Sequence, residues 1–222
     1  MSQPKLSALG EDSLVVRLPG LPSLEVSLQL ETLASQLQRQ LGVCGCWAGL
    51  SELAVRYRSA RQRDKALSGL SASLSSESKL TTVSTPRAAP REHTLTACLN
   101  GPDLDWVCGQ LDWEAAAFAD RLEASLFDVL AIGFQPGFAY LQARDPELRL
   151  QLPRRGTPRP RVPANSLAFA AGLAAVYPSA SPGGWHLLGV VDESVVGNNA
   201  DTRRLCRFRV GDAVRFKLRH AS

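Results

Sequence analysis

Hydrophobic residues in the first 74 positions switch between strand-like and helix-like spacing. Residues 13–18 and 53–57 each predict a strand, because apolar and polar residues alternate there. Between these strands apolar residues recur every three or four positions, which predicts a helix ended by Gly42 and carrying Leu30, Leu33, Ala34, Leu37 and Leu41. A second amphipathic helix is expected over residues 59–74, and residues 80–83 are compatible with a last strand. Two helices alternating with strands favour a small α+β sandwich.

A segment rich in Ser, Thr and Pro, residues 71–91, separates two parts of the chain that differ in their pattern of hydrophobic residues. The apolar period almost disappears in it, as is typical of a linker. We place a domain boundary between Pro86 and Pro90. The sequence therefore predicts one domain over residues 1–88 and a second over residues 89–222.

The second part begins with a strand over residues 95–99 and a turn over residues 100–103, followed by short helical material. Asp112 is expected to cap a helix over residues 113–124. From Leu126 onward, short apolar runs punctuated by Gly and Pro favour a compact β-barrel. The last of these runs predicts a hairpin-like pair of strands on either side of Gly211 and Asp212, with Phe208 and Val210 before the turn and Val214, Phe216 and Leu218 after it.

Composition excludes several classes of protein. The chain has 222 residues, of which 45% are hydrophobic and 21% charged, so it can bury a core. Its net charge of +4 comes from 25 basic and 21 acidic residues, a mixed surface that does not predict nucleic-acid binding. We expect no membrane span and no signal peptide, and hence a cytoplasmic protein. Five cysteines without paired Cys-x-x-Cys motifs predict buried thiols and no metal site.

Chemical information is concentrated in four segments, residues 132–141 (IGFQPGFAYL), 153–167, 177–185 and 210–216. Glycines there permit close backbone approach, while neighbouring prolines stiffen the loops. Rigid apolar walls for a small-ligand pocket would come from Phe134, Phe138, Tyr140 and Trp185. For any one of these loops taken alone, a tight barrel corner with aromatic residues in the core is the simpler interpretation.

A group of arginines makes a ligand pocket a better interpretation than a barrel corner. Six of them lie within 18 positions: Arg144, Arg149, Arg154, Arg155, Arg159 and Arg161. Arg154 and Arg159 directly follow prolines, and a fixed guanidinium suits a carboxylate or phosphate. A solvated basic loop explains Arg144, Arg149 and Arg155 well. An anionic small ligand therefore ranks first, a solvated loop second and nucleic acid third.

Taken together in chain order, the four segments resemble one family. It comprises the B subunit of 5-oxoprolinase, KipI-type kinase inhibitors, allophanate hydrolase subunit 1 and subdomains C and D of carboxyltransferase domains. The resemblance is strongest from about residue 101 to residue 216. It implies an α+β N-terminal domain, a ferredoxin-like sandwich, followed by a mostly-β cyclophilin-like barrel. It also implies two partners, the KipA-like C subunit and the A subunit of the enzyme, in the ATP-dependent opening of 5-oxo-L-proline to L-glutamate.

Carried over by position, the resemblance implies a pocket formed by the first three of these segments. Arg159, Arg161 and Ser166 would be catalytic, with an arginine holding an anionic group and Ser166 orienting the amide carbonyl. Substrate contacts would come from Phe134, Pro136, Phe138, Tyr140, Arg154, Asn165, Gly183, Gly184 and Trp185. No phosphate-binding Gly-x4-Gly-Lys-Ser/Thr motif is present, so the ATP that the complex uses is expected to bind on another protein of the complex.

Three positions depart from the family pattern. Leu122 stands where relatives usually carry His, Asn165 replaces a usual Gly, and Val190 replaces a usual Arg. The losses remove two candidate groups for proton transfer or anion binding. They slightly favour the alternative function, inhibition of sensor histidine kinase autophosphorylation, because a binding module need not keep catalytic groups. A lone small-molecule binder is the third hypothesis.

Overall fold

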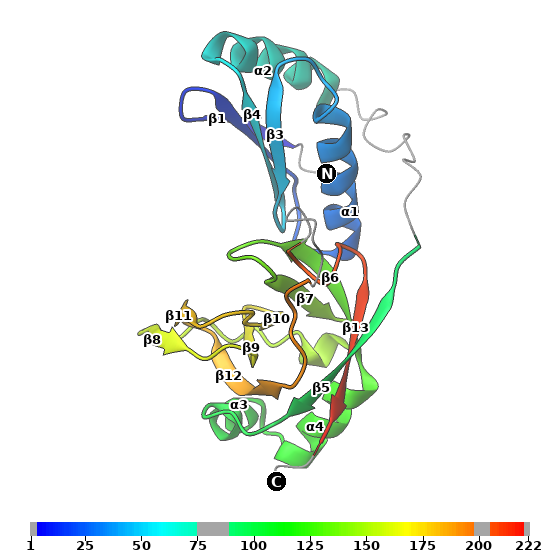
Figure 1. Cartoon of the computed structure of the whole chain (residues 1–222), viewed down its shortest axis with the longest axis vertical. Coiled ribbons are helices and arrows are strands. Elements are labelled where there is room, and N and C mark those ends of the chain that lie inside the picture. Colours follow the sequence, from blue (N-terminus) through cyan, green and yellow to red (C-terminus); the bar gives the residue numbers. More distant parts are fainter. Residues whose placement is uncertain (1–3, 75–88, 198–204, 220–222) are drawn as a thin grey trace. The chain divides into compact units, whose positions relative to one another are not determined.

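The computed structural model describes residues 4–74, 89–197 and 205–219, and for residues 71–74 it describes the backbone alone. The chain forms two compact units, Met1–Ala89 and Pro90–Ser222 (Figure 1).

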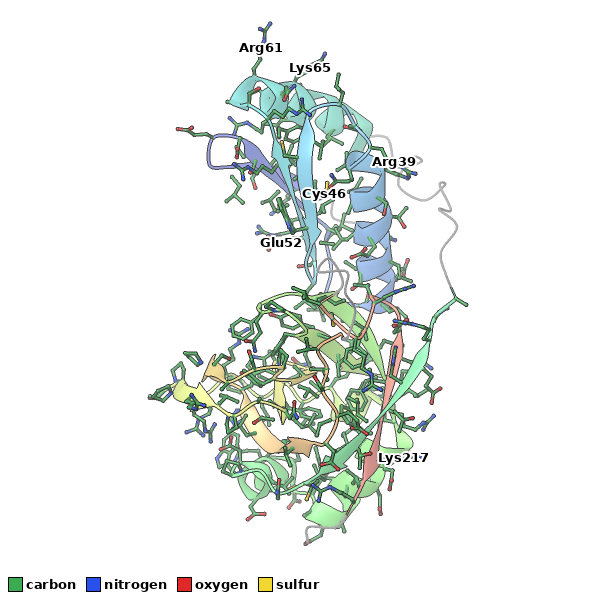
Figure 2. All side chains as sticks on the ribbon, viewed as in Figure 1. Arg39, Cys46, Glu52, Arg61, Lys65 and Lys217 are labelled. Atoms are coloured by element: carbon green, nitrogen blue, oxygen red, sulfur yellow. The ribbon has the colours of Figure 1, made fainter. Side chains whose placement is uncertain are left out.

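The first unit is a four-stranded sheet with two helices packed on one face (Figure 1). Its elements are β1 (Lys5–Leu9), β2 (Ser13–Arg17), α1 (Leu24–Leu37), β3 (Val43–Ala48), β4 (Glu52–Tyr57) and α2 (Ala60–Leu74). The strand order is β1-β2-β4-β3, and every neighbouring pair is antiparallel. Leu14, Val16, Leu30, Leu53 and Val55 are fully buried between the sheet and the helices. On the outer side, Arg61 and Lys65 project from α2 away from the sheet (Figure 2).

Both helices and two of these strands were predicted from the sequence, whereas β1 and β3 were not. The first helix is shorter than expected: it ends at Leu37, and Leu41 lies beyond it with 95% of its surface exposed. The apolar spacing in the sequence therefore continues about one turn beyond the end of the helix. The strand expected at residues 80–83 lies outside the described residues, so the ferredoxin-like arrangement stays a prediction.

The second unit is a closed barrel of seven strands in the order β10-β7-β6-β13-β5-β12-β9, which confirms the predicted β-barrel. Its cyclophilin-like character stays a prediction. The barrel strands are β5 (Glu92–Cys98), β6 (Leu126–Ile132), β7 (Ala139–Ala143), β9 (Ser166–Ala170), β10 (Leu173–Val176), β12 (His186–Val191) and β13 (Ala213–Leu218). A separate two-stranded ribbon, drawn in yellow and orange in Figure 1, pairs β8 (Arg159–Val162) with β11 (Ser181–Gly183). The helical elements are α3 (Leu104–Leu111), α4 (Ala115–Ala124) and the short 3-10 turn η1 (Pro146–Leu148).

Aromatic side chains fill the barrel. Phe127 meets Phe169 and Phe216 edge-to-face, with ring centroids 6.2 and 5.2 Å apart. Phe118 reaches Phe169 from α4 at 6.0 Å, and all four rings are almost completely buried. Such edge-to-face pairs stabilise a core beyond the area that they bury. These ring contacts join α4, β6, β9 and β13 in one core.

Two local predictions in the second unit are wrong. Asp112 does not cap the start of a helix. It ends α3 in the left-handed conformation (φ 55°), and α4 begins only at Ala115. The terminal hairpin is absent among the described residues, because β13 pairs in parallel with β5 and antiparallel with β6. The Asp212 carboxylate accepts the Arg209 amide hydrogen at 3.0 Å, so residues 209–212 form a turn instead of a strand.

The cysteine prediction holds only in part. Cys98 and Cys108 are buried, but Cys44 is exposed and Cys46 and Cys206 are half-buried, all with free thiols. Within the described ranges, no group of three or more His, Cys, Asp or Glu side chains is arranged to hold a metal ion. No helix in the described part of the chain is long and apolar enough to cross a bilayer.

Candidate functional site

The aromatic residues that were predicted to line a pocket form one cluster in the second unit. Trp185 lies 5.9 Å from Phe138 and 6.0 Å from Tyr140 between ring centroids. Phe138 also contacts Tyr140 at 5.0 Å and Tyr177 at 5.4 Å, in both cases with the rings steeply inclined to each other. Two separate stretches of the sequence, residues 132–141 and 177–185, therefore meet here.

The loop after β6 shapes one side of this cluster. Phe134 has a φ of 69°, which a bulky residue rarely adopts, and 62% of its surface is exposed. Its ring lies 5.2 Å from Phe138, and Pro136 in the same loop is also exposed. The Ser179 hydroxyl donates to Gln135 Oε1 at 2.9 Å, which links this loop to the segment after Tyr177. A strained, exposed aromatic residue in a braced loop is typical of a binding site.

The ribbon of β8 and β11 brings the arginine segment to the cluster. Arg159 and Gly183 are opposite each other in this ribbon, and the Arg155 amide donates to Gly184 O at 2.7 Å. A Cβ on Gly183 would overlap the Tyr177 hydroxyl group. Glycine is therefore required for the tyrosine to lie against this strand, as the loop composition predicted.

One buried carboxylate organises two of the arginines. Asp103 Oδ1 accepts from Arg155 Nη1 at 3.0 Å and from Arg159 Nη2 at 2.8 Å. Asp103 Oδ2 accepts the Leu187 amide hydrogen at 2.7 Å. Burial raises the pKa of Asp103, but the bonds from Arg159 and Leu187 outweigh it, so the pKa lies below its usual value. The carboxyl group is thus ionised at neutral pH.

The remaining two arginines are placed differently. Arg161 is exposed on β8. Arg154 is also exposed and lies beside Gly184, close enough for its charge to lower the pKa of Tyr140 and Tyr177. Burial is the larger influence on both phenols and keeps their pKa above the ordinary value. Both phenols therefore stay neutral near pH 7 and can donate hydrogen bonds.

Asn165 lies in a turn directly before Ser166, the first residue of β9, and next to Tyr177. Asn165 is left-handed (φ 62°), and its amide donates to Tyr177 O at 2.6 Å. The loop thus keeps the shape that a glycine would give it. The Ser166 hydroxyl is buried and donates to Pro163 O at 2.9 Å, which holds the turn. Its catalytic role stays a prediction.

The other two departures from the family pattern lie in the barrel wall and its helix. Leu122 is fully buried on α4 in the barrel core. Val190 is half-buried on β12, where it pairs with Cys98 and Ser166. Leu122 is thus part of the apolar core, whereas Val190 is a partly exposed residue of the barrel wall.

A surface hollow of about 480 Å³ lies elsewhere in the second unit, between Arg121, Arg144, Arg215 and Asp145. It is a weaker candidate than the aromatic cluster, because each arginine is already neutralised. The pairs are Arg121 with Asp145 (3.0 Å) and Glu147, Arg144 with Asp128 (2.8 Å), and Arg215 with Glu92 (3.0 Å). None of its lining residues is aromatic.

Comparison with known proteins decides the family. The model of the carboxyltransferase domain, subdomain C and D, matches residues 4–205. The chain belongs to this family. Among named members, the B subunit of 5-oxoprolinase from Escherichia coli O157:H7 is 40% identical over 119 residues, which cover 52% of this chain and 51% of that protein. The chain thus matches about half the length of this relative.

Solved structures agree with the carboxyltransferase-domain fold. TTHA0988 superposes with a TM-score of 0.72 at 29% identity, covering 96% of this chain and 41% of the other. The Kluyveromyces lactis urea amidolyase gives a TM-score of 0.79 over 98% of this chain and 15% of the other, but at 14% identity it shows the fold alone. This carboxyltransferase-type fold is therefore also found within longer chains.

Sequence reasoning missed three residues of the site. Asp103 follows Gly101-Pro102 directly before α3, a position typical of a helix cap, yet its side chain makes no capping bond. A solvated loop was a sufficient explanation of Arg155 from the sequence, but its side chain donates to Asp103. Tyr177 was part of a motif but was not given a role, although its ring contacts Phe138 and its carbonyl accepts the Asn165 amide hydrogen.

Proposed function

We propose that this member of the carboxyltransferase family is the B subunit of an ATP-dependent 5-oxoprolinase, which opens 5-oxo-L-proline to L-glutamate. The named relatives support a component of a hydrolase complex. The observation that carries the proposal is the ribbon of β8 and β11, which brings Arg154, Arg155 and Arg159 next to Gly183 and Gly184, the residues directly before Trp185. An apolar wall next to guanidinium groups suits a small ring that carries a carboxylate.

In this proposal each group has a distinct task. Phe138, Tyr140 and Trp185 pack against the ring of the substrate and exclude water from it. Arg159, with Arg154 and Arg161, binds anionic oxygens, either the substrate carboxylate or a phosphoryl group transferred to the amide carbonyl. Phosphorylation of that oxygen would supply the leaving group that a stable lactam lacks. Ser166, Gly183 and Gly184 fix the loops that carry these groups.

The proposal also assigns partners. A KipA-like C subunit would share the pocket, and the A subunit would complete the complex and its use of ATP. The sequence contains no phosphate-binding loop motif, which supports a nucleotide site on one of these partners.

The test is glutamate release from 5-oxoproline by the co-expressed complex, with and without ATP. Wild type should release glutamate only with ATP. Arg159→Ala should lower kcat/KM by at least about tenfold, because it removes a charge-assisted bond and leaves Asp103 with one fewer partner. Lys217→Gln is the control, since Lys217 extends from β13 into solvent (Figure 2). Equal loss in the two variants, or none in Arg159→Ala, would remove Arg159 from the mechanism.

Inhibition of a sensor histidine kinase stays a prediction from the sequence resemblance. A phosphorylation assay with candidate kinases, run on the same preparation, separates it from a role in the hydrolase.

A further inference from the structure

We infer that Arg155 and Arg159 form a two-guanidinium oxyanion site, positioned by Asp103. Arg155 Nε and Arg159 Nη1 would be the donors that hold the anion. This inference rests on the proposed function only for the identity of the anion, which would be the carboxylate of 5-oxoproline. The site itself is defined by its hydrogen-bonding groups.

The first observation is the shared carboxylate. Asp103 Oδ1 accepts from both guanidinium groups, while Oδ2 is occupied by the Leu187 amide. Asp103 is 5% exposed, so neither oxygen is freely available to water. Each arginine donates one charge-assisted bond to this carboxylate, which restricts where its guanidinium group can lie. Asp103 is therefore a positioning residue for Arg155 and Arg159.

The second observation is the charge that remains. Two guanidinium groups share one carboxylate, so the cluster keeps one net positive charge. Arg155 and Arg159 have 36% and 21% of their side-chain surface exposed, which leaves the cluster partly open to a ligand. A partly buried positive charge attracts an anion more strongly than a fully solvated one, because water screens it less.

The third observation is a pair of unused donors. Arg155 Nε and Arg159 Nη1 are buried, and neither has a hydrogen-bond partner among the residues that the structure describes. Buried donors are nearly always paired in folded proteins. Two unpaired donors on the two arginines that share Asp103 therefore point to a missing acceptor. Carboxylate and phosphate oxygens are the acceptors that guanidinium groups bind best.

The site is continuous with the aromatic cluster. Arg159 lies opposite Gly183 in the ribbon, and the Arg155 amide is bonded to Gly184, the residue before Trp185. In our inference, a ligand with a flat ring and an acidic group would lie with its ring towards Trp185 and its acidic group at the two arginines. In this arrangement the site would favour the acid over the corresponding neutral lactam.

The test compares ligands that differ only in the acidic group. Isothermal titration calorimetry on the full chain would measure 5-oxo-L-proline, 2-pyrrolidinone, which is the same ring without the carboxylate, and inorganic phosphate. Wild type should bind 5-oxoproline at least about tenfold more tightly than 2-pyrrolidinone. Arg155→Gln should remove most of this preference while leaving the affinity for 2-pyrrolidinone unchanged. Lys217→Gln should behave as wild type.

Two further variants separate positioning from packing. Arg155→Lys keeps the charge but loses the Nε donor, so it should restore the preference only in part. Asp103→Asn should also reduce it, because the guanidinium groups lose their common anchor. If Arg155→Gln weakens both lactams equally, Arg155 only supports the fold and the inference is wrong.

Phosphate distinguishes failure of the site from failure of the proposed function. If wild type ignores 5-oxoproline but binds phosphate, and Arg155→Gln weakens phosphate binding about tenfold, the oxyanion site stands and the proposed substrate does not. If wild type binds neither anion, or if Arg155→Gln leaves both affinities unchanged, the oxyanion site is overturned.

Discussion

Asp212 gives the second unit a stability that depends on pH, through the bonds of a single buried carboxylate. Its oxygens accept from the Arg91 amide and guanidinium at 3.1 and 2.8 Å, from His93 Nε2 at 3.0 Å and from the Arg209 amide at 3.0 Å. Burial alone raises the pKa of Asp212, but the bonds from Arg91 and His93 more than compensate and lower it from 3.8 to about 2.

The size of the effect follows from this shift. Because the folded-state pKa lies below the unfolded value, ionised Asp212 stabilises the fold above about pH 4, and this contribution is lost as the pH falls towards 2. A shift of nearly two pH units corresponds to about 2 kcal/mol of unfolding free energy. Asp212→Asn removes the titrating group and so removes this pH-dependent part.

Urea unfolding followed by tryptophan fluorescence measures the difference. Three of the four tryptophans, Trp106, Trp113 and Trp185, report on the second unit. Wild type should be about 2 kcal/mol or more stable than Asp212→Asn at pH 7, and the gap should narrow by about 2 kcal/mol between pH 5 and pH 2. A gap of constant size over this range would refute the reasoning, since the carboxylate would then not titrate as its contacts require.

Three other changes have expected outcomes. Gly183→Ala should lower the free energy of unfolding by about 1–3 kcal/mol, because the new Cβ overlaps the Tyr177 hydroxyl. Adding Tyr177→Phe to this variant should restore part of the lost stability, and a double variant no more stable than Gly183→Ala would contradict the overlap. Asn165→Gly should change stability by less than about 1 kcal/mol, whereas Asn165→Val should cost about 1–2 kcal/mol at its left-handed φ; thermal denaturation checks both, and equal effects would contradict the backbone argument. Leu122→His should lower the melting temperature, because it places a polar ring in the fully buried barrel core; an unchanged melting temperature would mean that the core relaxes around it.

Short-range patterns predicted the elements whose chemistry is local. The alternating residues 95–99 and 53–57 lie in β5 and β4. Gly183 lies so close to the Tyr177 hydroxyl that only glycine fits there. Predictions failed where contacts with residues far away in the sequence determine the local structure. Gly211-Asp212 has the composition of a hairpin turn, yet the Asp212 side chain binds Arg91, more than 100 positions away, and β13 joins β5 instead.

The same distinction explains the site. Aromatic residues in stiff glycine-proline loops indicated a pocket wall, and the structure brings Phe138, Tyr140 and Trp185 together. Asp103 could not be found in this way, because its partners Arg155 and Arg159 lie more than 50 positions along the chain. A local pattern cannot distinguish an aspartate that caps a helix from one that binds two distant arginines.

The most direct measurement of the central claim is glutamate release by the complex assembled with and without this chain. Partner proteins together with wild-type chain should convert 5-oxoproline to glutamate when ATP is present, and the partner proteins alone should not. Adding back the Arg155→Gln and Arg159→Ala chains should restore assembly but little activity. Equal glutamate release without the chain would contradict the claim that its arginines and aromatic residues form part of the catalytic pocket.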